Sequence, residues 1–553
     1  MKRVRHLITL AIVGIILGSC AKQSSPTGGP RDEKPPVLLE SDPKDQSLNL
    51  KPELLKLTFD EFIALENASK GVVVTPRIDK DKIEFTALKN TVSVKLNQDL
   101  EDSTTYVFDF QKAVVDLSEK NPAENLKIVF STGPSIDSLS ITGNINFYYP
   151  ETKEDYKNVL VGLYPKSDTT DVFTAQPYYL AQVDTLGNFK LSNLKNGSYR
   201  AYAWRDLNGN LKAESKSEEH DFMLDSIGLE SNLKDLQFNL AKADLTPIRI
   251  LRSTTTGKNY DVLLNRNPIE SKLTTEEIGK KYFFTSSEKR IRIYSKEVKK
   301  DSIPFKLELI DSVGFQKDTL IWAKFPDSER KPEKLETTVN SGKNFYQNLE
   351  IELKFNKPLG YLNLDSLYVQ YDTASYIRLN DKMLSFSDST KRDLLRIQLS
   401  IPDSLDKEIF TLRASDSTFI DIEGQVNEKK IEANYRKLKR ENLADEISGQ
   451  IQGAIPPFIV QLLDNKNEII KEIYLDKGNK YSFKLVEPGT FKIRVIEDQN
   501  QNYRWDPSNY TLRRQAERVF YFKGEEGKSE IIIRGGWTLE DQNINATKKT
   551  GLN

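Results

Sequence analysis

Two oxygen-rich stretches share one spacing that suits cation binding. Both follow the pattern Asp-x-Asn-x-Asn-x-x-x-acid, formed by Asp206, Asn208, Asn210 and Glu214 and again by Asp498, Asn500, Asn502 and Asp506. Ca²⁺ takes roughly six to eight oxygen ligands, and alternating Asp and Asn side chains in a tight loop supply several at once. In the alternative interpretation, the same side chains hydrogen-bond the loop backbone. The pattern therefore predicts either two structural Ca²⁺ sites or two Asx-rich hairpin loops.

The spacing resembles the first part of an EF-hand loop and departs from it later. Position six is Leu211 or Tyr503 where an EF-hand has Gly, and position twelve is Ser217 or Asn509 where it has Glu. A Ca²⁺ ion held by this incomplete set would rigidify the loop and would not imply catalysis.

The few Cys and His residues limit the available chemistry. Cys20 is the single Cys, which excludes an internal disulfide and a Cys-rich zinc site. His6 lies near the start of the chain, so a catalytic triad or a multi-His metal site would depend on His220. We expect His220, which lies among carboxylates, to be a solvated loop residue, with a share in a metal site as the alternative. Carboxylate-only chemistry stays open.

The composition indicates a folded chain and argues against a nucleic-acid-binding protein. The 553 residues carry 80 Lys and Arg against 81 Asp and Glu, a net charge of −1, and 38% are hydrophobic. This balance argues against a basic surface for nucleic acid or a polybasic membrane patch, and the apolar content is enough for packed cores.

The first residues form an export signal. A basic start is followed by an apolar run at 7–17, which is too short to span a bilayer. Leu17-Gly-Ser-Cys20 comes next and resembles a bacterial lipobox, which implies removal of residues 1–19 and acylation of Cys20. An ordinary signal peptide with an incidental Cys is the alternative. Several acyl chains would anchor the protein stably in a bilayer.

The segment after the lipobox is a tether of Gly, Pro and polar residues at 20–35. Pro26-Thr-Gly-Gly-Pro-Arg-Asp32 followed by Pro35-Pro36 resembles the start of Bacteroidota outer-membrane lipoproteins that carry S-layer-type bacterial Ig-like domains. The resemblance implies a lipid-anchored outer-membrane protein on the periplasmic or cell-surface face, with the surface somewhat favoured.

From residue 36 onward, short alternating runs bounded by turn residues predict an all-β chain of tandem sandwiches. Pairs of echoes keep the same order along the chain, such as Ile141-Thr-Gly-Asn-Ile145 with Ile447-Ser-Gly-Gln-Ile451, and Gly197-Ser-Tyr-Arg200 with Gly489-Thr-Phe-Lys492. We infer that a two-domain unit occurs twice, with a further β domain between the copies.

Sequence motifs suggest the type of each domain. Leu57-Thr-Phe-Asp-Glu61 and Phe130-Ser-Thr-Gly133 resemble an Ig-like domain, and Asp184-Thr-Leu-Gly-Asn188 with its following strands resembles a transthyretin-like or carboxypeptidase regulatory-like sandwich. The expected order is an Ig-like domain at 36–134, a transthyretin-like sandwich at 135–244, a β domain of unclear type at 245–340, a degenerate Ig-like domain at 341–440, a second transthyretin-like sandwich at 445–540 and a tail at 541–553.

Two further patterns have competing interpretations. Aromatic clusters at 147–149, 176–179 and 202–204 suggest a sugar or protein platform, although strand-like surroundings favour core positions. Asp followed by Ser or Thr and then a small or aliphatic residue resembles the O-glycosylation acceptor of Bacteroidota envelope proteins, whereas Asp-Ser and Asp-Thr pairs also open turns. This second pattern occurs at Asp102, Asp137, Asp168, Asp184, Asp225, Asp301, Asp311, Asp318, Asp365, Asp372, Asp388, Asp403 and Asp416.

The sequence favours a non-enzymatic, lipid-anchored scaffold or interaction subunit of an envelope complex for protein assembly, secretion or uptake. Its partners would be the bilayer, through acylated Cys20, and outer-membrane proteins, with no nucleic acid and no required cofactor. A carbohydrate-binding or adhesive surface lipoprotein is the first alternative. A carboxylate-based hydrolase with a deep acidic cleft is the second.

Overall fold

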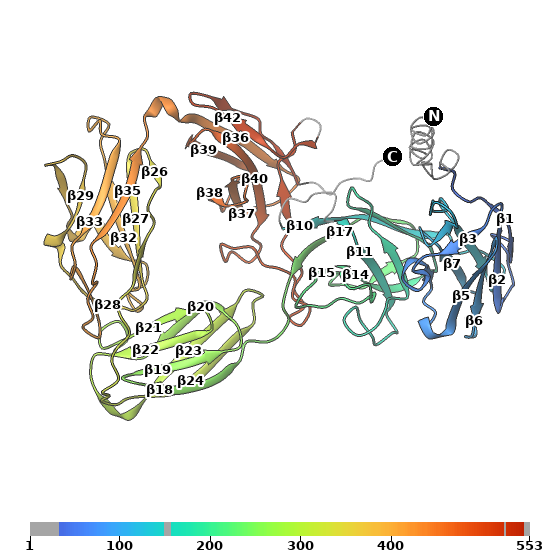
Figure 1. Cartoon of the computed structure of the whole chain (residues 1–553), viewed down its shortest axis with the longest axis horizontal. Helices are drawn as coiled ribbons and strands as arrows, with labels where there is room; N and C mark the ends of the chain where they lie inside the picture. The colour runs from blue at the N-terminus through green and yellow to red at the C-terminus, as the bar shows by residue number, and fades with distance from the viewer. Residues whose placement is uncertain (1–31, 149–155, 525–526, 547–553) are drawn as a thin grey trace, which may run out of the picture. The chain divides into compact units, whose positions relative to one another are not determined.

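The computed structural model describes residues 32–148, 156–524 and 527–546. These residues form an all-β protein of several sheets, as the sequence predicts (Figure 1). The regular α-helix among them is the single turn α2 (Ala68–Gly71). The predicted leader, Cys20, most of the tether and the end of the predicted tail lie outside the described residues. Within the described ranges, no helix is long and apolar enough to cross a bilayer.

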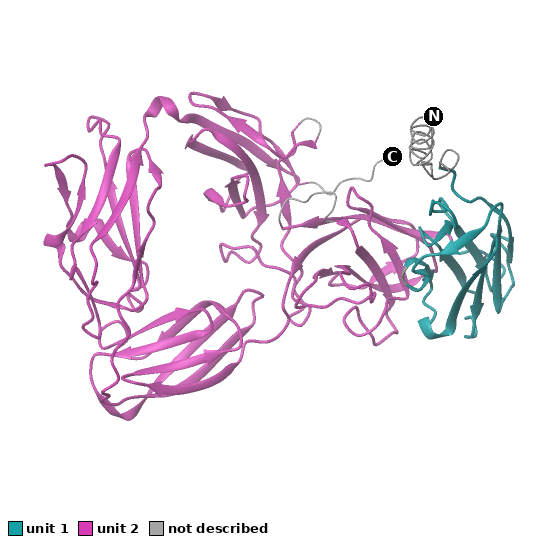
Figure 2. Cartoon of the chain, in the orientation of Figure 1, with its two compact units in different colours: residues 1–137 teal, residues 138–553 magenta. Residues whose placement is uncertain are grey.

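The chain divides into two compact units, residues 1–137 and residues 138–553 (Figure 2). Unit 1 is a sandwich with sheets β1-β2-β6-β5 and β4-β7-β9 and a small β3-β8 pair. Its core gathers the inward residues of both sheets, including Phe59, Phe108 and Phe130. Its strands are β1 (Leu38–Asp42), β2 (Leu54–Phe59), β3 (Ile63–Leu65), β4 (Val73–Thr75), β5 (Ile83–Leu88), β6 (Thr91–Leu96), β7 (Thr105–Asp109), β8 (Val114–Asp116) and β9 (Lys127–Ser131).

Unit 2 begins with a sandwich whose strands are ordered β12-β11-β14-β15-β17-β10-β13, with β16 pairing β14. The parallel contact of β10 with β17 lies beside Gly143, where a side chain would collide with the Leu236 carbonyl. The strands are β10 (Leu139–Phe147), β11 (Val159–Pro165), β12 (Tyr179–Gln182), β13 (Asn188–Leu194), β14 (Gly197–Arg205), β15 (Glu219–Phe222), β16 (Ile227–Leu229) and β17 (Leu233–Lys242).

The next sandwich has its own core, which includes Phe284, Phe305 and Phe325. It stacks sheet β18-β19-β22-β21 on sheet β20-β23-β24. The strands are β18 (Ile250–Thr256), β19 (Asn259–Leu264), β20 (Pro268–Thr274), β21 (Tyr282–Ser287), β22 (Arg290–Ser295), β23 (Lys299–Asp311) and β24 (Gln316–Phe325).

The fourth sandwich repeats the strand order of unit 1. Sheet β25-β27-β32-β31 corresponds to β1-β2-β6-β5, the pair β28-β34 to β3-β8, and the central strands of β26-β35-β33-β29-β30 to β9-β7-β4. The strands are β25 (Thr337–Val339), β26 (Asn344–Phe345), β27 (Asn348–Phe355), β28 (Leu359–Leu362), β29 (Leu367–Gln370), β30 (Tyr376–Arg378), β31 (Leu384–Phe386), β32 (Leu394–Ser400), β33 (Ile409–Ala414), β34 (Phe419–Asp421) and β35 (Ile431–Lys437).

The last sandwich repeats the first sandwich of unit 2. Sheets β39-β36-β43 and β38-β37-β40-β41, with β42 on β40, correspond strand by strand to β10 through β17. Each of the two sandwich types therefore occurs twice, in the same order along the chain, as the repeated sequence motifs predict. The strands are β36 (Ala444–Gln452), β37 (Phe458–Leu463), β38 (Ile469–Leu475), β39 (Lys480–Val486), β40 (Gly489–Glu497), β41 (Val519–Tyr521), β42 (Ile531–Ile533), β43 (Thr538–Leu539) and β44 (Ile544–Asn545).

Candidate functional site

The first oxygen-rich loop is organised by the Asp206 carboxylate directly after β14. Its Oδ1 accepts the backbone N–H groups of Gly209 and Asn210 at 2.8 and 3.1 Å, and its Oδ2 accepts that of Leu211 at 2.9 Å. Leu211 adopts a left-handed backbone with φ of 60°, which turns its N–H toward the carboxylate. Asp206 is buried, and these bonds compensate its lost hydration.

The other oxygen-bearing side chains of this loop also take part in hydrogen bonds. Asn208 Oδ1 accepts the Asn210 N–H at 2.9 Å, and the Asn210 side-chain amide donates to Glu214 Oε1 at 3.0 Å. Glu218, which the sequence pattern missed, accepts the backbone N–H groups of Leu207 and Glu214. Burial raises the pKa of Glu218, and the nearby Asp206 and Glu214 charges raise it further.

The second loop repeats this arrangement after β40. Asp498 is fully buried and accepts the N–H groups of Asn502 at 3.0 Å and Tyr503 at 2.9 Å. The side-chain amides of Asn500 and Asn502 both donate to Asp506. Glu517 closes the loop by accepting the backbone N–H groups of Gln499 and Asp506 at 3.0 Å. Burial raises the pKa of Glu517 to about 7, helped by the Asp506 and Asp498 charges.

The structure thus brings each predicted set of side chains together in one loop. The oxygens of both sets meet backbone N–H groups and Asn amides, as in Asx turns. Within the residues that the structure describes, no group of three or more His, Cys, Asp or Glu side chains is arranged to hold a metal ion. The Ca²⁺ interpretation stays a prediction.

His220 does not lie in a solvated loop, so that expectation was wrong. It belongs to β15, is only 2% exposed, and packs edge-on against the Phe173 ring at 5.1 Å. Burial lowers its pKa to about 4, because the low-dielectric surroundings disfavour the imidazolium. The expectation failed because the Glu218-Glu-His-Asp221 segment looks polar in sequence, whereas its pairing with β14 and β17 places it inside the sandwich.

Asp221 is the second buried titratable group on β15. Its Oδ2 accepts the Asn239 N–H of β17 at 2.7 Å. Burial raises its pKa to about 7 against the action of backbone N–H donors from Asn239, Phe222 and Ala516. Asp221 and Glu517 are therefore both buried carboxyls, at 2% and 6% exposure.

Residues 503–518, named the arm here, extend from the last sandwich of unit 2 onto its first two sandwiches. Ser508 Oγ donates to the His220 carbonyl at 3.0 Å, and Gln515 Nε2 donates to the Phe222 carbonyl at 3.0 Å. Asn509 Nδ2 donates to the Val313 carbonyl at 2.8 Å. The arm therefore bonds the backbone of two other sandwiches.

Aromatic side chains from the arm and from the first sandwich of unit 2 both contribute to this contact. Tyr510 of the arm packs on Phe173, Tyr202 and Phe222 at centroid distances of 5.5, 5.8 and 5.2 Å. A reciprocal contact places Tyr148 of the first sandwich against Trp505 at 4.1 Å and under the Arg494 guanidinium at 4.0 Å. Arg494 also donates to the Tyr148 hydroxyl at 2.9 Å and to Gln461 at 2.8 Å. The duplicated sandwiches thus cover one another's outer sheet faces.

The aromatic clusters that suggested a platform are largely interior. Phe147, Tyr179, Tyr202 and Trp204 are buried in the cores of the first sandwich of unit 2, as their strand-like surroundings favoured. These positions offer no platform to a ligand. Tyr149, the last residue of the first cluster, lies outside the described residues.

Several of the Asp-Ser and Asp-Thr pairs open turns. Asp184 Oδ1 accepts the N–H groups of Leu186 and Asn188, and Asp311 Oδ1 accepts those of Val313 and Phe315. The turn interpretation explains these two sites, while glycosylation of the pattern stays a prediction.

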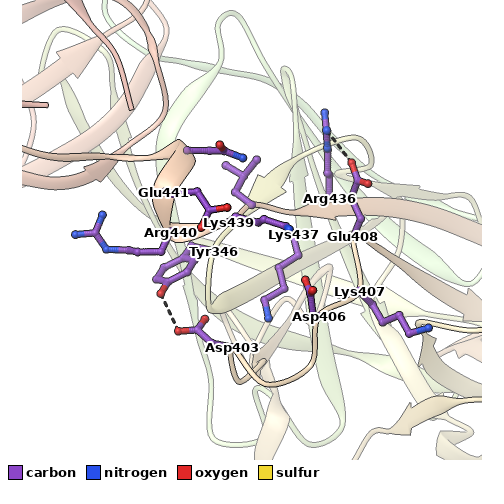
Figure 3. A pocket seen from close by; sticks show the side chains of 12 residues that line it. Tyr346, Asp403, Asp406, Lys407, Glu408, Arg436, Lys437, Lys439, Arg440 and Glu441 are labelled. Carbon is purple, nitrogen blue, oxygen red and sulfur yellow. Dashed lines mark hydrogen bonds and ion pairs between the residues drawn. The ribbon is translucent and has the colours of Figure 1, made fainter. Parts of the chain in front are cut away.

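A hollow of about 450 Å³ lies at the end of the fourth sandwich (Figure 3). Its wall mixes acids and cations in paired form: Tyr346 donates to Asp403 at 2.8 Å, and Arg436 pairs with Glu408 at 2.7 Å. Lys437 donates to the carbonyls of Pro402 and Leu405. This mixed lining differs from the deep acidic cleft that a carboxylate hydrolase requires.

Comparison with known proteins identifies the first sandwich. Residues 32–132 match the family described as bacterial Ig-like domain. No curated protein matches the chain. The Ig-like expectation for this part is confirmed.

Similar solved structures resemble the chain only loosely. Domains 1–6 of the surface layer protein SbsC are 11% identical over 90% of this chain and 68% of that chain, with a TM-score of 0.17. SGBP-B of the mixed-linkage glucan utilization locus of Bacteroides ovatus, in complex with a mixed-linkage heptasaccharide, is 13% identical over 64% and 89%, with a TM-score of 0.15. The T6 backbone pilin of Streptococcus pyogenes is 8% identical over 74% and 98%, with a TM-score of 0.12. At these TM-scores the likenesses carry no argument about ligands or function.

Proposed function

We propose that the protein is a non-enzymatic, lipid-anchored outer-membrane subunit of an envelope complex, in which unit 1 holds a partner protein near the membrane. The observation that carries this proposal is an apolar tip on unit 1. Phe62, Leu88 and Leu117 are 58%, 75% and 54% exposed there. Large apolar side chains gathered on a soluble domain mark interaction surfaces.

The three residues lie on adjoining backbone segments. The Leu117 N–H donates to the Phe62 carbonyl, and the Ile63 N–H donates to the carbonyl of Lys89, the residue after Leu88, both at 2.9 Å. The register of β3 with β8 fixes this arrangement by pairing Ile63 with Asp116. We name Phe62, Leu88 and Leu117 the tip.

The tether joins unit 1 at the end that carries the tip. The Asp32 carbonyl accepts Asn121 Nδ2 at 2.8 Å, and the Val37 N–H donates to Asp60 Oδ1 at 2.8 Å. A chain extends by at most about 3.5 Å per residue. Acylation of Cys20 would therefore keep the start of unit 1, at Asp32, within roughly 40 Å of the bilayer.

Carboxylates gather beside Phe62 at the tip and favour a partner protein over the bilayer. Partial burial, followed by the charges of Asp116, Asp60, Asp32 and Glu119, raises the pKa of Glu61, which precedes Phe62. A negative rim repels anionic lipid surfaces and complements basic residues of a protein partner. The arm supports a scaffold role, because it ties three sandwiches of unit 2 together at the level of backbone carbonyls.

The test starts from the native lipoprotein in mild detergent. A photo-reactive residue at Leu88 should cross-link to a stoichiometric partner, and Phe62→Ser with Leu117→Ser should lose it. Leu251→Ser is the matched control, since Leu251 is 67% exposed on β18. Cys20→Ser should release the protein from the membrane fraction. Recovery of no stoichiometric partner, or equal loss with the Leu251 variant, would contradict the proposal.

The sequence resemblance adds a domain assignment to this proposal. We propose that the sandwiches at 135–244 and 445–540 are transthyretin-like modules and that the parent group is that of Bacteroidota outer-membrane lipoproteins. The repeated strand order and the Gly turns at the start of β14 and β40 support the pairing of the two modules.

A further inference from the structure

One sheet face of the fourth sandwich carries aromatic and polar side chains instead of core residues. The sheet is ordered β26-β35-β33-β29-β30, and β29, β33 and β35 are labelled in Figure 1. Successive side chains of a strand lie on opposite faces. Leu367, Val369, Phe410 and Leu412 occupy the core side. The opposite face, named the outer face, presents Tyr368, Gln370, Tyr376, Arg378, Thr411, Arg413, Glu432 and Asn434.

The strand register sorts these eight side chains into two rows. Residues directly opposite one another in neighbouring strands lie close enough for their side chains to interact. The first row is Arg378, Tyr368, Arg413 and Glu432, and the second row is Tyr376, Gln370, Thr411 and Asn434. Each row therefore starts at the edge strand β30 and crosses to β35.

The β30 end of the outer face is aromatic. The Tyr368 and Tyr376 ring centroids lie 5.1 Å apart, with an angle of 56° between the rings. The Arg378 guanidinium lies 5.9 Å from the Tyr376 ring and donates to its hydroxyl at 3.4 Å. Tyr376 is 46% exposed, so its ring is available to a ligand.

The β35 end offers planar hydrogen-bonding groups that hold one another in place. Arg413 donates to the Gln370 amide oxygen and to the Glu432 carboxylate. Thr411 Oγ1 donates to Asn434 Oδ1 at 2.8 Å. Groups that are ordered before binding lose less conformational entropy when a ligand arrives.

The outer face continues toward the hollow of Figure 3. Arg436 follows Asn434 by two residues on β35 and is exposed, so it lies on the same face. Its ion pair with Glu408 forms part of the wall of the hollow. A ligand longer than one unit can therefore extend from the tyrosines to the hollow.

We propose that the outer face binds a neutral polysaccharide. Tyr376 and Tyr368 stack against the C–H faces of pyranose rings, and the amide of Asn434 bonds the hydroxyl groups. Amide, guanidinium and hydroxyl groups supply both donors and acceptors, as sugar hydroxyls require.

The residue types decide between ligand classes. The centre of a protein interface is depleted in acidic residues, whereas Glu432 lies within the two rows; the 48% exposed Ile409 lies outside them, opposite Arg436. A polyanion would require a cationic field, whereas Arg413 is paired with Glu432 and Arg436 with Glu408. A neutral, hydroxyl-rich chain suits both conditions.

The experiment is native gel electrophoresis of the purified full chain in gels that contain dextran, galactomannan, xylan or a soluble β-1,3-glucan, with heparin as the polyanion. We expect retardation by at least one neutral polysaccharide that persists in high salt. Tyr376→Ala should weaken binding about tenfold, the order expected for losing an aromatic contact. Asn434→Ala should weaken it less, and Tyr361→Ala, at a 58% exposed residue of β28, should leave it unchanged.

Each other outcome would overturn the proposal. Retardation by none of the four neutral polysaccharides would remove the ligand class. Equal binding by the Tyr376 and Tyr361 variants would remove the site, and retardation by heparin alone that disappears in salt would show simple electrostatics. Because this assay uses purified protein and unit 2 residues, its failure would leave the partner-binding proposal for the unit 1 tip untouched.

Discussion

Replacing Asp221 by Asn should change how the stability of the first sandwich of unit 2 depends on pH. Asp221 is fully enclosed, and burial raises its pKa from 3.8 to about 7. Between these two values the folded state holds a proton that the unfolded state has released. Stability therefore falls as the pH rises through this window. The Asp221→Asn side chain does not titrate there, so the variant escapes this fall.

The size of the effect follows from the two pKa values. One pKa unit corresponds to about 1.4 kcal/mol. By linkage, the raised pKa costs wild type about 2 kcal/mol at pH 5 and about 4 kcal/mol at pH 8. The amide also changes the contacts with the Asn239, Phe222 and Ala516 N–H groups, but that cost is the same at both pH values. The variant should therefore gain roughly 2–3 kcal/mol relative to wild type between pH 5 and pH 8.

Native-state hydrogen exchange measures this difference where it arises. The Asn239 N–H, which donates to Asp221, and the neighbouring amides of β17 report the opening free energy of the sandwich. Comparing variant and wild type at the same pH cancels the intrinsic exchange rate. Asp225→Asn, at an exposed position of the same sandwich, should follow wild type at both pH values. A difference between the Asp221 variant and wild type that is equal at pH 5 and pH 8 would refute the reasoning.

Three further results are expected. The folded-state pKa of His220, about 4, lies below its ordinary 6.5, so the free energy of unfolding should fall by up to about 3 kcal/mol as the pH falls from 6.5 to 4. His220→Asn should remove this acid sensitivity in the same exchange assay. An unchanged acid profile in the variant would argue against burial of His220 as the cause. Tyr510→Ala should lower the free energy that holds the arm in place by about 3 kcal/mol, because it removes three ring contacts, and proteolysis within 503–518 should become faster. Tyr510→Phe removes only the hydroxyl contact to Tyr202 and should cost no more than about 1 kcal/mol. Equal proteolysis of both variants would contradict the ring contribution. Structural Ca²⁺ in the two loops predicts that millimolar Ca²⁺ raises the melting temperature and that Asp206→Asn with Asp498→Asn abolishes the rise, whereas no rise in wild type would remove the cation.

Local chemistry explains why much of the fold is predictable. Alternating runs such as Leu54–Phe59 place Leu55, Leu57 and Phe59 on one buried face, which the period of two alone indicates. The duplicated pair is also visible in sequence, because echoes such as those in β14 and β40 occupy the same position in the same strand order. The oxygen-rich loops could be located because Asx turns form from residues that are close in the chain.

Long-range pairing decided the features that the sequence did not show. His220 lies in a run of charged residues, and only the pairing of β15 with β14 and β17 buries it. The carboxylate that closes the second loop, Glu517, is separated from Asp498 by the length of the arm, so no local spacing marks it.

Local patterns in the sequence are enough to predict the all-β class and the place of Asp206 and Asp498 in tight polar loops, and comparison of distant segments shows the repeated pair. The tertiary structure decided which aromatics face outward: Tyr202 and Trp204 are core residues, whereas Tyr376 stays exposed. It also decided which remote segments meet, as Tyr148 does with Arg494. The physical reason is that alternation shows only that a strand has two faces. Which of them is covered depends on the sheet, loop or arm that packs against it.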